Sequence, residues 1–244
     1  MTGHIDNIEL VQEYAVAITI NDVNYAVMMA SPFDLDDFVL GLLLTEQVIK
    51  QRYDVHDISI SLDEISCTAI INVSVANRIF EATALNTRQH KANSSCGICG
   101  VKALEQAMPT LSPVVNTPPL SIKHINHVLA QMPTWQIRSN NTGALHAAFL
   151  VNESGDIIAC REDLGRHNAL DKLIGHILSK QINSTSLSII ITSRCSVELV
   201  NKTVIANIAS LLCLASPSQL AVNIAKANNL NLIHVRKHDA PIYF

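Results

Sequence analysis

Apolar and polar residues alternate along much of the first third of the chain, which predicts β-strands that bury one face. Four strands are expected there: Tyr14–Ile20, Val23–Met29, Val55–Leu62 and Cys67–Val75. The Asn21-Asp22 pair between the first two strands is a turn signal, so these strands should form a hairpin. One helix interrupts the series at Leu35–Ile49, because Ser31-Pro32 favours a helix start and three aspartates complement the positive end of the helix.

The second half of the chain alternates strands with helices of about ten residues. A proline-rich stretch at Met108–Leu120 separates the halves. Beyond it, helices are predicted at Ile122–Met132, Asn168–Leu178, Glu198–Ala206 and Ser218–Asn228, and strands at Gly143–Val151, Asp156–Arg161, Ser188–Thr192, Ala209–Leu214 and Leu230–Val235. This alternation predicts βαβ units and a mostly parallel sheet. We therefore expect an α/β fold with a mixed sheet flanked by helices, divided into a strand-rich part at residues 1–108 and an α/β domain at residues 109–244.

The composition favours a packed globular protein. Of the 244 residues, 48% are hydrophobic and 16% are charged, the opposite of the balance in a disordered chain. The net charge of −4 argues against broad binding to nucleic acid, although it is compatible with one local phosphate pocket. The apolar run Phe38–Leu44 is far shorter than the roughly 18 residues that span a bilayer, and the N-terminus lacks a signal-peptide pattern. We expect a cytoplasmic protein with neither nucleic acid nor a membrane as a partner.

One cysteine pair differs from the other cysteines. Four of the six cysteines are scattered singly, whereas Cys96 and Cys99 form a CxxC motif ahead of a short predicted helix at Val101–Met108. Unpaired N–H groups and the dipole at the start of a helix stabilise a thiolate, so the thiol becomes nucleophilic near neutral pH. Glycines at positions 97 and 100 allow a sharp turn that leaves the sulfurs accessible. The motif therefore suits sulfur transfer through a persulfide.

Three other chemistries use the same motif. A structural zinc site needs a second CxxC or a histidine pair at suitable spacing, and the remaining cysteines are single. A thioredoxin-like redox pair normally follows the first strand of a βαβ unit, whereas this one follows a strand-rich half. A zinc deaminase needs H-x-E upstream and P-C-x-x-C downstream, yet Ser95 precedes Cys96 and His90 is not followed by the glutamate. Zinc and redox roles remain open, and deamination is disfavoured.

A second cluster lies between Cys160 and Lys172, where seven of thirteen residues are charged or histidine. The simplest interpretation is a solvated turn before a helix, with Asp163 or Asn168 as the cap. The functional interpretation is a loop at the carboxyl end of a strand, where open α/β sheets bind ligands. Gly165 would allow close backbone approach, Arg166 would bind a phosphate, and the helix start would favour an anion.

Three more polar loops are predicted at the same edge of the sheet: Asn140–His146, Thr192–Ser196 and Ala215–Ser218. Each loop alone is more typical of turn chemistry than of a site. Together, however, they add Arg194 and several hydroxyl groups to Arg166, which indicates a pocket for a phosphate-bearing nucleotide. The histidines at positions 4, 124, 127 and 176 have no such neighbours in sequence and are interpreted as surface or structural residues.

With these motifs taken in order, the sequence resembles the formate dehydrogenase accessory sulfurtransferase family, FdhD, over nearly its whole length. The matching motifs are Val27–Pro32, Asp34–Phe38, Gly41–Glu46, Ser95–Gly100, Thr142-Gly143, His146–Ala148, Arg161–Asp163, Gly165–Asn168, Asp171-Lys172, Ser193-Arg194, Glu198–Val200, Ala215–Ser218 and Ala221-Val222. The CxxC motif alone is a weak signal, whereas the whole set in this order is specific.

The resemblance implies a sulfur carrier that takes persulfide sulfur from a cysteine desulfurase. It implies delivery to the molybdenum (or tungsten) bis-guanine-dinucleotide cofactor of formate dehydrogenase, with Cys96 as the persulfide carrier and Cys99 as its partner. It also implies a cytidine-deaminase-like fold in the second part, a homodimer, no permanent metal, and a cofactor segment at His234–Asp239. A non-enzymatic chaperone that binds the molybdenum cofactor without moving sulfur is the alternative.

The polar loops and the family resemblance together predict one set of cofactor-binding residues. These are His146, Arg161, Gly165, Arg166, His167, Asn168, Ser193, Arg194, Ser216, His234, Val235, Arg236, Lys237, His238 and Asp239. The phosphate-binding role of Arg166 and Arg194 is an inference from the loops, whereas the segment from His234 to Asp239 follows from the resemblance.

Overall fold

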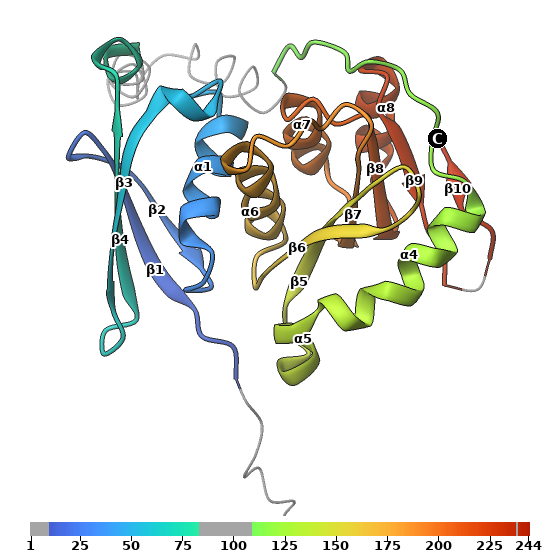
Figure 1. The fold of residues 1–244 in the computed structure, drawn as a ribbon, viewed down its shortest axis with the longest axis horizontal. Coiled ribbons are helices and arrows are strands. Elements are labelled where there is room, and N and C mark those ends of the chain that lie inside the picture. The colour runs from blue at the N-terminus through green and yellow to red at the C-terminus, as the bar shows by residue number, and fades with distance from the viewer. Residues whose placement is uncertain (1–9, 83–108, 238) are drawn as a thin grey trace, which may run out of the picture.

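The computed structural model describes residues 10–82, 109–237 and 239–244, which form two β-sheets with helices between and beside them (Figure 1). The predicted motif at Cys96 and Cys99, the predicted helix at Val101–Met108, and His238 lie outside the described residues. No helix within the described ranges is long and apolar enough to cross a bilayer.

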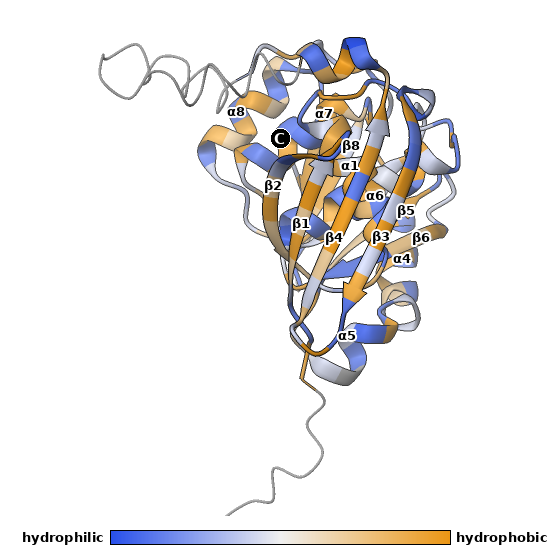
Figure 2. Cartoon of the chain, turned by 90° about the vertical axis from the view of Figure 1, so that its left-hand side faces the viewer, coloured by the Kyte–Doolittle hydropathy of each residue, from blue (hydrophilic) through white to orange (hydrophobic). Residues whose placement is uncertain are grey.

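The first sheet has the strand order β2-β1-β4-β3. Its strands are β1 (Tyr14–Ile20), β2 (Val23–Ala30), β3 (Val55–Asp63) and β4 (Thr68–Val75). All four were predicted, and β1 and β2 form the expected antiparallel hairpin. Alternate residues of β1 are buried under helix α1 (Leu35–Thr45), because the apolar side chains of the strand all point to that face. The opposite face carries exposed apolar side chains, including Val27 and Ile70 (Figure 2).

The second sheet has the order β10-β9-β8-β7-β5-β6. Its strands are β5 (His146–Val151), β6 (Ile157–Asp163), β7 (Ser188–Arg194), β8 (Ser210–Ala215), β9 (Asn231–His234) and β10 (Ile242–Tyr243). Only the β7–β8 and β8–β9 pairs are parallel, so the expectation of a mostly parallel sheet is wrong, whereas a mixed sheet flanked by helices is confirmed. The antiparallel pairs arise because β6 returns beside β5 by a short turn and β5 then lies against β7.

Helices cover both faces of the second sheet. On one face pack α6 (Arg166–Ser179), α7 (Val197–Ile205) and α8 (Gln219–Ala227), and on the other packs α4 (Ile122–Trp135). A short helix, α5 (Ile137–Thr142), occupies a region expected to be a loop. The first helix ends at Thr45, four residues before the predicted end, because Gln47 adopts a left-handed conformation.

The two sheets are joined through a close crossing of α1 and α6 (Figure 1). A Cβ atom added to Gly41 would lie 1.8 Å from the carbonyl oxygen of Asp171. One added to Gly175 would lie 1.8 Å from the carbonyl oxygen of Asp37. Glycine is therefore required at both positions because the helix backbones themselves are in contact.

We predict that Gly175→Ala lowers the free energy of unfolding by about 3 kcal/mol or more, since the new methyl group must separate the helices. Helix propensity alone predicts the opposite sign, a gain of about 1 kcal/mol. Urea unfolding followed by circular dichroism measures the change. Gly143→Ala is the control, because Gly143 has open space and a φ of 67°, so it should cost only about 1–2 kcal/mol of backbone strain. Unchanged or increased stability of Gly175→Ala would contradict this prediction.

Candidate functional site at one edge of the second sheet

The carboxyl ends of β6, β7, β8 and β9 all meet at one edge of the second sheet, because each of these strands runs in the same direction. The register aligns His146 at the start of β5 with Asp163 at the end of β6, and Arg194 at the end of β7 with Ala215 at the end of β8. The loops that lead into α6, α7 and α8 therefore start from this edge. The sequence-based expectation that these loops share one edge is met by the strand order.

Two helices begin at this edge without a side-chain cap. Gly165, which has no side chain, precedes α6. Ser196 precedes α7, and its hydroxyl accepts no capping hydrogen bond, whereas Ser218 caps α8 by accepting from the Ala221 amide. Helix starts carry partial positive charge on their free N–H groups. The starts of α6 and α7 are close together, since His167 Nε2 lies 3.5 Å from Ser196 Oγ. The pair forms a local region of positive potential.

Arg166, the first residue of α6, adds a full positive charge to this region. Its Nε atom is buried and has no hydrogen-bond partner among the described residues. A buried guanidinium nitrogen without a partner is costly, and an anionic oxygen is the partner that suits it. Burial and the Arg166 charge lower the pKa of His146, and burial lowers the pKa of His167. Both shifts favour the neutral imidazole, mainly because of burial.

Glu198 contacts this cluster, although it was not among the expected cofactor-binding residues. Its Oε2 lies 3.3 Å from His167 Nε2, and its charge partly offsets the lowering of the His167 pKa. The available signals were its place in the family-like motif Glu198–Val200 and in the first turn of the predicted helix after Ser196. Glu198 can orient the His167 ring and accept its proton.

Several other predicted residues also lie at or next to this edge. Ser193 is buried and its hydroxyl donates to the Arg194 carbonyl, whereas Arg194 and Ser216 are exposed. His234 ends β9. Val235 is buried, and its amide donates to the Cys213 carbonyl. The Arg236 guanidinium donates to the Ala240 carbonyl and forms an ion pair with Asp239 at 3.2 Å, while Lys237 is exposed. Of these residues, Arg194, Ser216 and Lys237 have exposed side chains that a ligand in solvent can reach.

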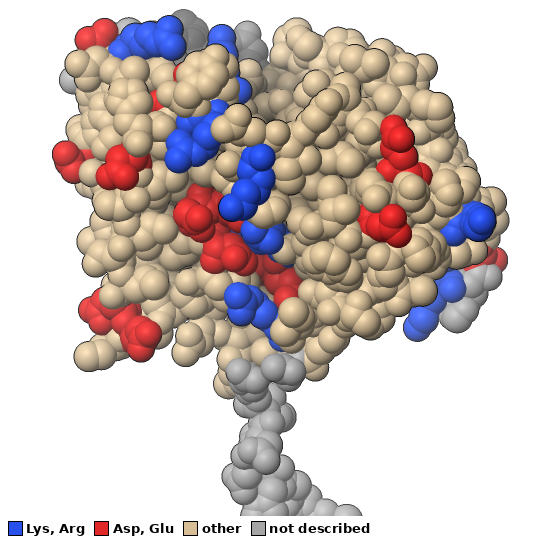
Figure 3. Space-filling view, in the orientation of Figure 1, with Lys and Arg blue, Asp and Glu red and all other residues tan. Residues whose placement is uncertain are grey.

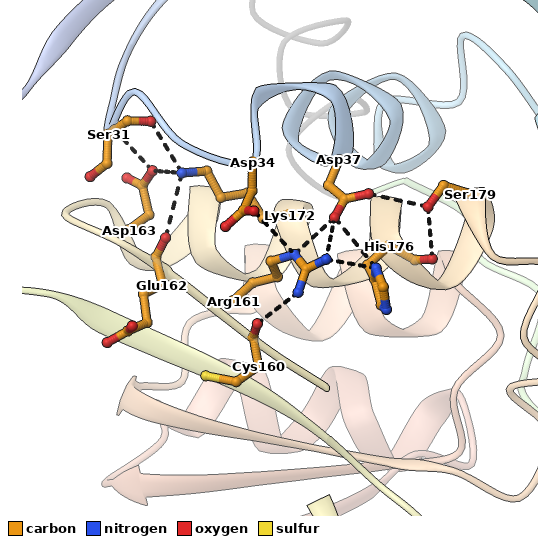
Figure 4. A network of polar contacts seen from close by, with 10 residues as sticks. All are labelled: Ser31, Asp34, Asp37, Cys160, Arg161, Glu162, Asp163, Lys172, His176 and Ser179. Carbon is orange, nitrogen blue, oxygen red and sulfur yellow. Dashed lines mark hydrogen bonds and ion pairs between the residues drawn. The ribbon is translucent and has the colours of Figure 1, made fainter. Parts of the chain in front are cut away.

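A buried polar network holds the loop that leads into α6 (Figure 4). The Asp163 carboxylate, at 0% exposure, lies 2.7 Å from Lys172 Nζ, which is also fully buried. It accepts further hydrogen bonds from the amides of Ser31 and Gly165 and from the Asn168 side chain. Burial lowers the pKa of Lys172 and Asp163 opposes that shift. The predicted cofactor residues Gly165 and Asn168 thus belong to a fixed loop tied to the first sheet at Ser31.

Arg161 is not brought to the edge, although the sequence grouped it with the cofactor-binding residues. Its guanidinium lies between α1 and α6, where it donates to Asp37 at 2.6 and 2.8 Å and contacts His176 Nδ1 at 2.7 Å (Figure 4). Its side chain is 18% exposed. Basic and acidic side chains gather along this boundary in Figure 3. His176, expected to be a surface or structural residue, has a structural role here.

The neighbouring residue Glu162 positions α5. Its two carboxylate oxygens accept hydrogen bonds from the backbone amides of Arg138 and Ser139, at 3.0 and 2.8 Å. A carboxylate at the start of a helix compensates the free N–H groups there. The consecutive acids Glu162 and Asp163 therefore point to opposite sides of the chain and fix α5 and α6 respectively.

Two of the described single cysteines, Cys160 and Cys195, are poor nucleophiles. Burial raises the pKa of Cys160 to about 12. A hydrogen bond with Cys213, together with burial, raises the pKa of Cys195. A thiol must ionise to attack sulfur, so these groups are unreactive near neutral pH. In the described ranges, histidine, cysteine and acidic side chains form no cluster of three that could hold a metal ion.

Known proteins similar to this chain share most of its length. The profile of the FdhD/NarQ family matches residues 11–244. The sulfur carrier protein FdhD of Bordetella bronchiseptica is 34% identical over 234 residues, covering 95% of this chain and 84% of the relative. That of Acinetobacter baylyi is 35% identical over 235 residues, covering 94% and 85%. A crystal structure of a candidate formate dehydrogenase accessory protein from Desulfotalea psychrophila has the same fold, with a TM-score of 0.73 at 21% identity, covering 96% and 87%.

We predict that Lys172→Met lowers the free energy of unfolding by about 3–5 kcal/mol, because it leaves the Asp163 carboxylate buried without its cation. The double variant Asp163→Asn with Lys172→Met should lose less, since it removes both charges. Urea unfolding measures both. Lys226→Met is the matched control, because Lys226 is exposed on α8 and should change stability by no more than about 0.5 kcal/mol. A double variant less stable than Lys172→Met would show that the cost is not an unpaired charge.

Proposed function

Because the chain belongs to the FdhD/NarQ family, we propose that it is a sulfur carrier that accepts sulfur from a cysteine desulfurase as a persulfide on Cys96. In this proposal the sulfur is delivered to the molybdenum bis(molybdopterin guanine dinucleotide) cofactor that formate dehydrogenase requires. The curated relatives are sulfur carrier proteins, which supports the transfer of sulfur in general.

Sulfur is accepted in one step and released in a second. The Cys96 thiolate attacks the outer sulfur of the donor persulfide, the donor S–S bond breaks, and the donor cysteine leaves as a thiolate. The Cys99 thiolate then attacks the inner sulfur of the Cys96 persulfide, so a Cys96–Cys99 disulfide forms and hydrosulfide is released to the acceptor. The two cysteines lose two electrons in this second step, and two equivalents of a cellular thiol restore them by successive disulfide exchange, leaving as their own disulfide.

The observation that carries the acceptor half of the proposal is the positive region at the edge of the second sheet. A guanine dinucleotide presents a diphosphate, and diphosphate oxygens are suitable partners for the Arg166 Nε atom and for the free amides that begin α6 and α7. Arg194 and Lys237 are exposed at the same edge and can bind further oxygens. The residues present therefore fit a nucleotide-bearing cofactor.

His146 and His167 would become protonated when the diphosphate binds. Their pKa values are lowered in the free protein, and a nearby anion favours the protonated imidazole. Each ring can then donate a charge-assisted hydrogen bond, with Glu198 holding His167 in position. These residues bind and orient the acceptor, while the cysteines move the sulfur.

We predict that Cys96→Ala abolishes persulfide formation. The protein is incubated with a cysteine desulfurase and cysteine, and intact-mass spectrometry counts the added sulfur. The wild type should gain 32 Da steps (about the mass of one sulfur atom), Cys96→Ala should not, and Cys213→Ala should behave as the wild type because that thiol is fully buried. Normal maturation of formate dehydrogenase by Cys96→Ala would instead support a cofactor-binding chaperone that moves no sulfur.

We predict that Arg166→Gln weakens binding of guanosine diphosphate by about 10–100-fold, the loss of one charge-assisted hydrogen bond of about 1.5–3 kcal/mol. Isothermal titration calorimetry measures the dissociation constant. Lys226→Gln removes the same charge from the last turn of α8, away from the edge, and should leave binding unchanged. Equal affinity of Arg166→Gln and the wild type would contradict the assignment of the edge.

A further inference from the structure

A groove lies at the other ends of the helices that begin at the candidate site. It has a volume of about 590 Å³ and is bounded by the last turns of α6 and α7 and by the turn that follows α1. Helix α6 has 14 residues and is therefore about 21 Å long, so the groove and the candidate site are separated by that length. None of the residues assigned to cofactor binding lines the groove.

The floor of the groove is apolar. Leu44 near the end of α1, Ile174 and Ile177 on α6, Ile182 just after it, and Ile205 at the end of α7 all line it. Ile174 and Ile177 are 1% and 7% exposed, so they belong to the core, whereas Leu44, Ile182 and Ile205 are partly exposed. A floor of branched aliphatic side chains gains free energy when another apolar group covers it.

The rim of the groove is basic. Lys50 and Arg52 line it, no acidic side chain lines it in the described part of the chain, and Tyr53 beside them is 72% exposed. This is unusual in a chain whose net charge is −4. An exposed tyrosine and a partly exposed arginine beside an apolar floor are of the residue types that dominate protein–protein binding.

The rim is held in place by its own backbone contacts. The Asp54 carboxylate accepts hydrogen bonds from the amides of Lys50 and Gln51, and Arg52 donates to the Val55 carbonyl at 2.8 Å. On the opposite side, Gln181 and Asn207 end α6 and α7 in left-handed conformations. The groove is thus built before anything binds, which lowers the entropic cost of binding.

From this geometry we infer that the groove is a docking site for a peptide segment of a partner protein. The segment would insert aliphatic side chains against Leu44, Ile182 and Ile205 and place acidic side chains over Lys50 and Arg52. The charges decide this choice, because Lys50 and Arg52 are the charged side chains that line the rim among the described residues, so an acidic flank is complementary to it and a basic flank is repelled. The inference goes beyond the proposed function and does not depend on the sulfur chemistry. A partner bound here leaves the edge of the second sheet open.

The experiment uses the full chain and three fluorescein-labelled peptides of about four helical turns. The first carries leucines on one face and glutamates elsewhere, the second replaces the glutamates with lysines, and the third replaces the leucines with serines. Fluorescence anisotropy should show that the first peptide binds at least tenfold more tightly than either of the others. The double variant Lys50→Glu with Arg52→Glu should reverse the preference in favour of the lysine peptide.

Lys226→Glu, a charge reversal on α8 outside the groove, is the matched control and should keep the wild-type preference. Equal binding of the three peptides, or an unchanged preference in the double variant, would overturn the inference. Binding of dodecanoate that Tyr53→Ala weakens, with no binding of either leucine peptide, would identify a lipid-like ligand and also overturn it. Analytical ultracentrifugation compares the wild type with the double variant. If the wild type and Lys226→Glu are dimers and the double variant is a monomer, the occupant is a second copy of this chain and the inference is overturned. Persulfide formation on Cys96 is read separately, so failure here is distinguishable from failure of the proposed function.

Discussion

The contact between the backbones of α1 and α6 is the constraint on which the rest of this structure depends. Gly41 and Gly175 allow the helices to touch, since a Cβ at either position would overlap a carbonyl group of the other helix. Helix α1 covers the first sheet, and α6 packs on the second. Their crossing therefore joins two cores that would otherwise be separate, and it fixes where α6 begins and ends.

Charged groups buried around this crossing add specificity. The Asp163–Lys172 pair joins the end of β6 to α6, and both side chains also bond to the Ser31 backbone ahead of α1. Lys202 bonds to the Asp171 carboxylate at 2.8 and 2.9 Å. Burial raises the pKa of Asp171 to about 6, and Lys202 opposes that shift, so the carboxylate is ionised at neutral pH. Buried ion pairs gain little net stability over apolar packing, but a misaligned crossing would leave each charge without its partner. They consequently select one arrangement of the two helices.

The direction of α6 and α7 gives the two ends of the molecule different chemistry. Their first turns carry free amides and Arg166 at the edge of the second sheet, which suits an anion. Their last turns surround an apolar groove with Lys50 and Arg52 on its rim. Because both helices span the whole distance, a ligand at one end need not displace a ligand at the other.

The sequence by itself determined most of the local structure. Alternation and turn signals located nearly every described strand, and the loops with Arg166 and Arg194 were correctly expected at one edge, because carboxyl ends of strands that share a direction meet there. The sequence pattern did not predict α5, because that short helix is stabilised by Glu162. The backbone amides that donate to Glu162 belong to Arg138 and Ser139, which are 24 and 23 residues earlier in the chain. The helix propensity of residues 137–142 alone does not predict a contact this distant in sequence.

Only the tertiary structure decided how the charged residues of the Cys160–Lys172 cluster are used. In sequence, Arg161 and Arg166 are equivalent cations near a predicted helix start. In the fold, Arg161 points to α1 and is neutralised by Asp37, whereas Arg166 at the sheet edge has a buried nitrogen with no hydrogen-bond partner among the described residues. The physical reason is that Arg161 lies on β6 and Arg166 begins α6, so the two side chains leave the backbone in different directions and long-range packing sets what each one meets. Composition and spacing predicted a basic site, and packing decided that Arg161 is paired with Asp37 while the Arg166 Nε atom has no partner among the described residues.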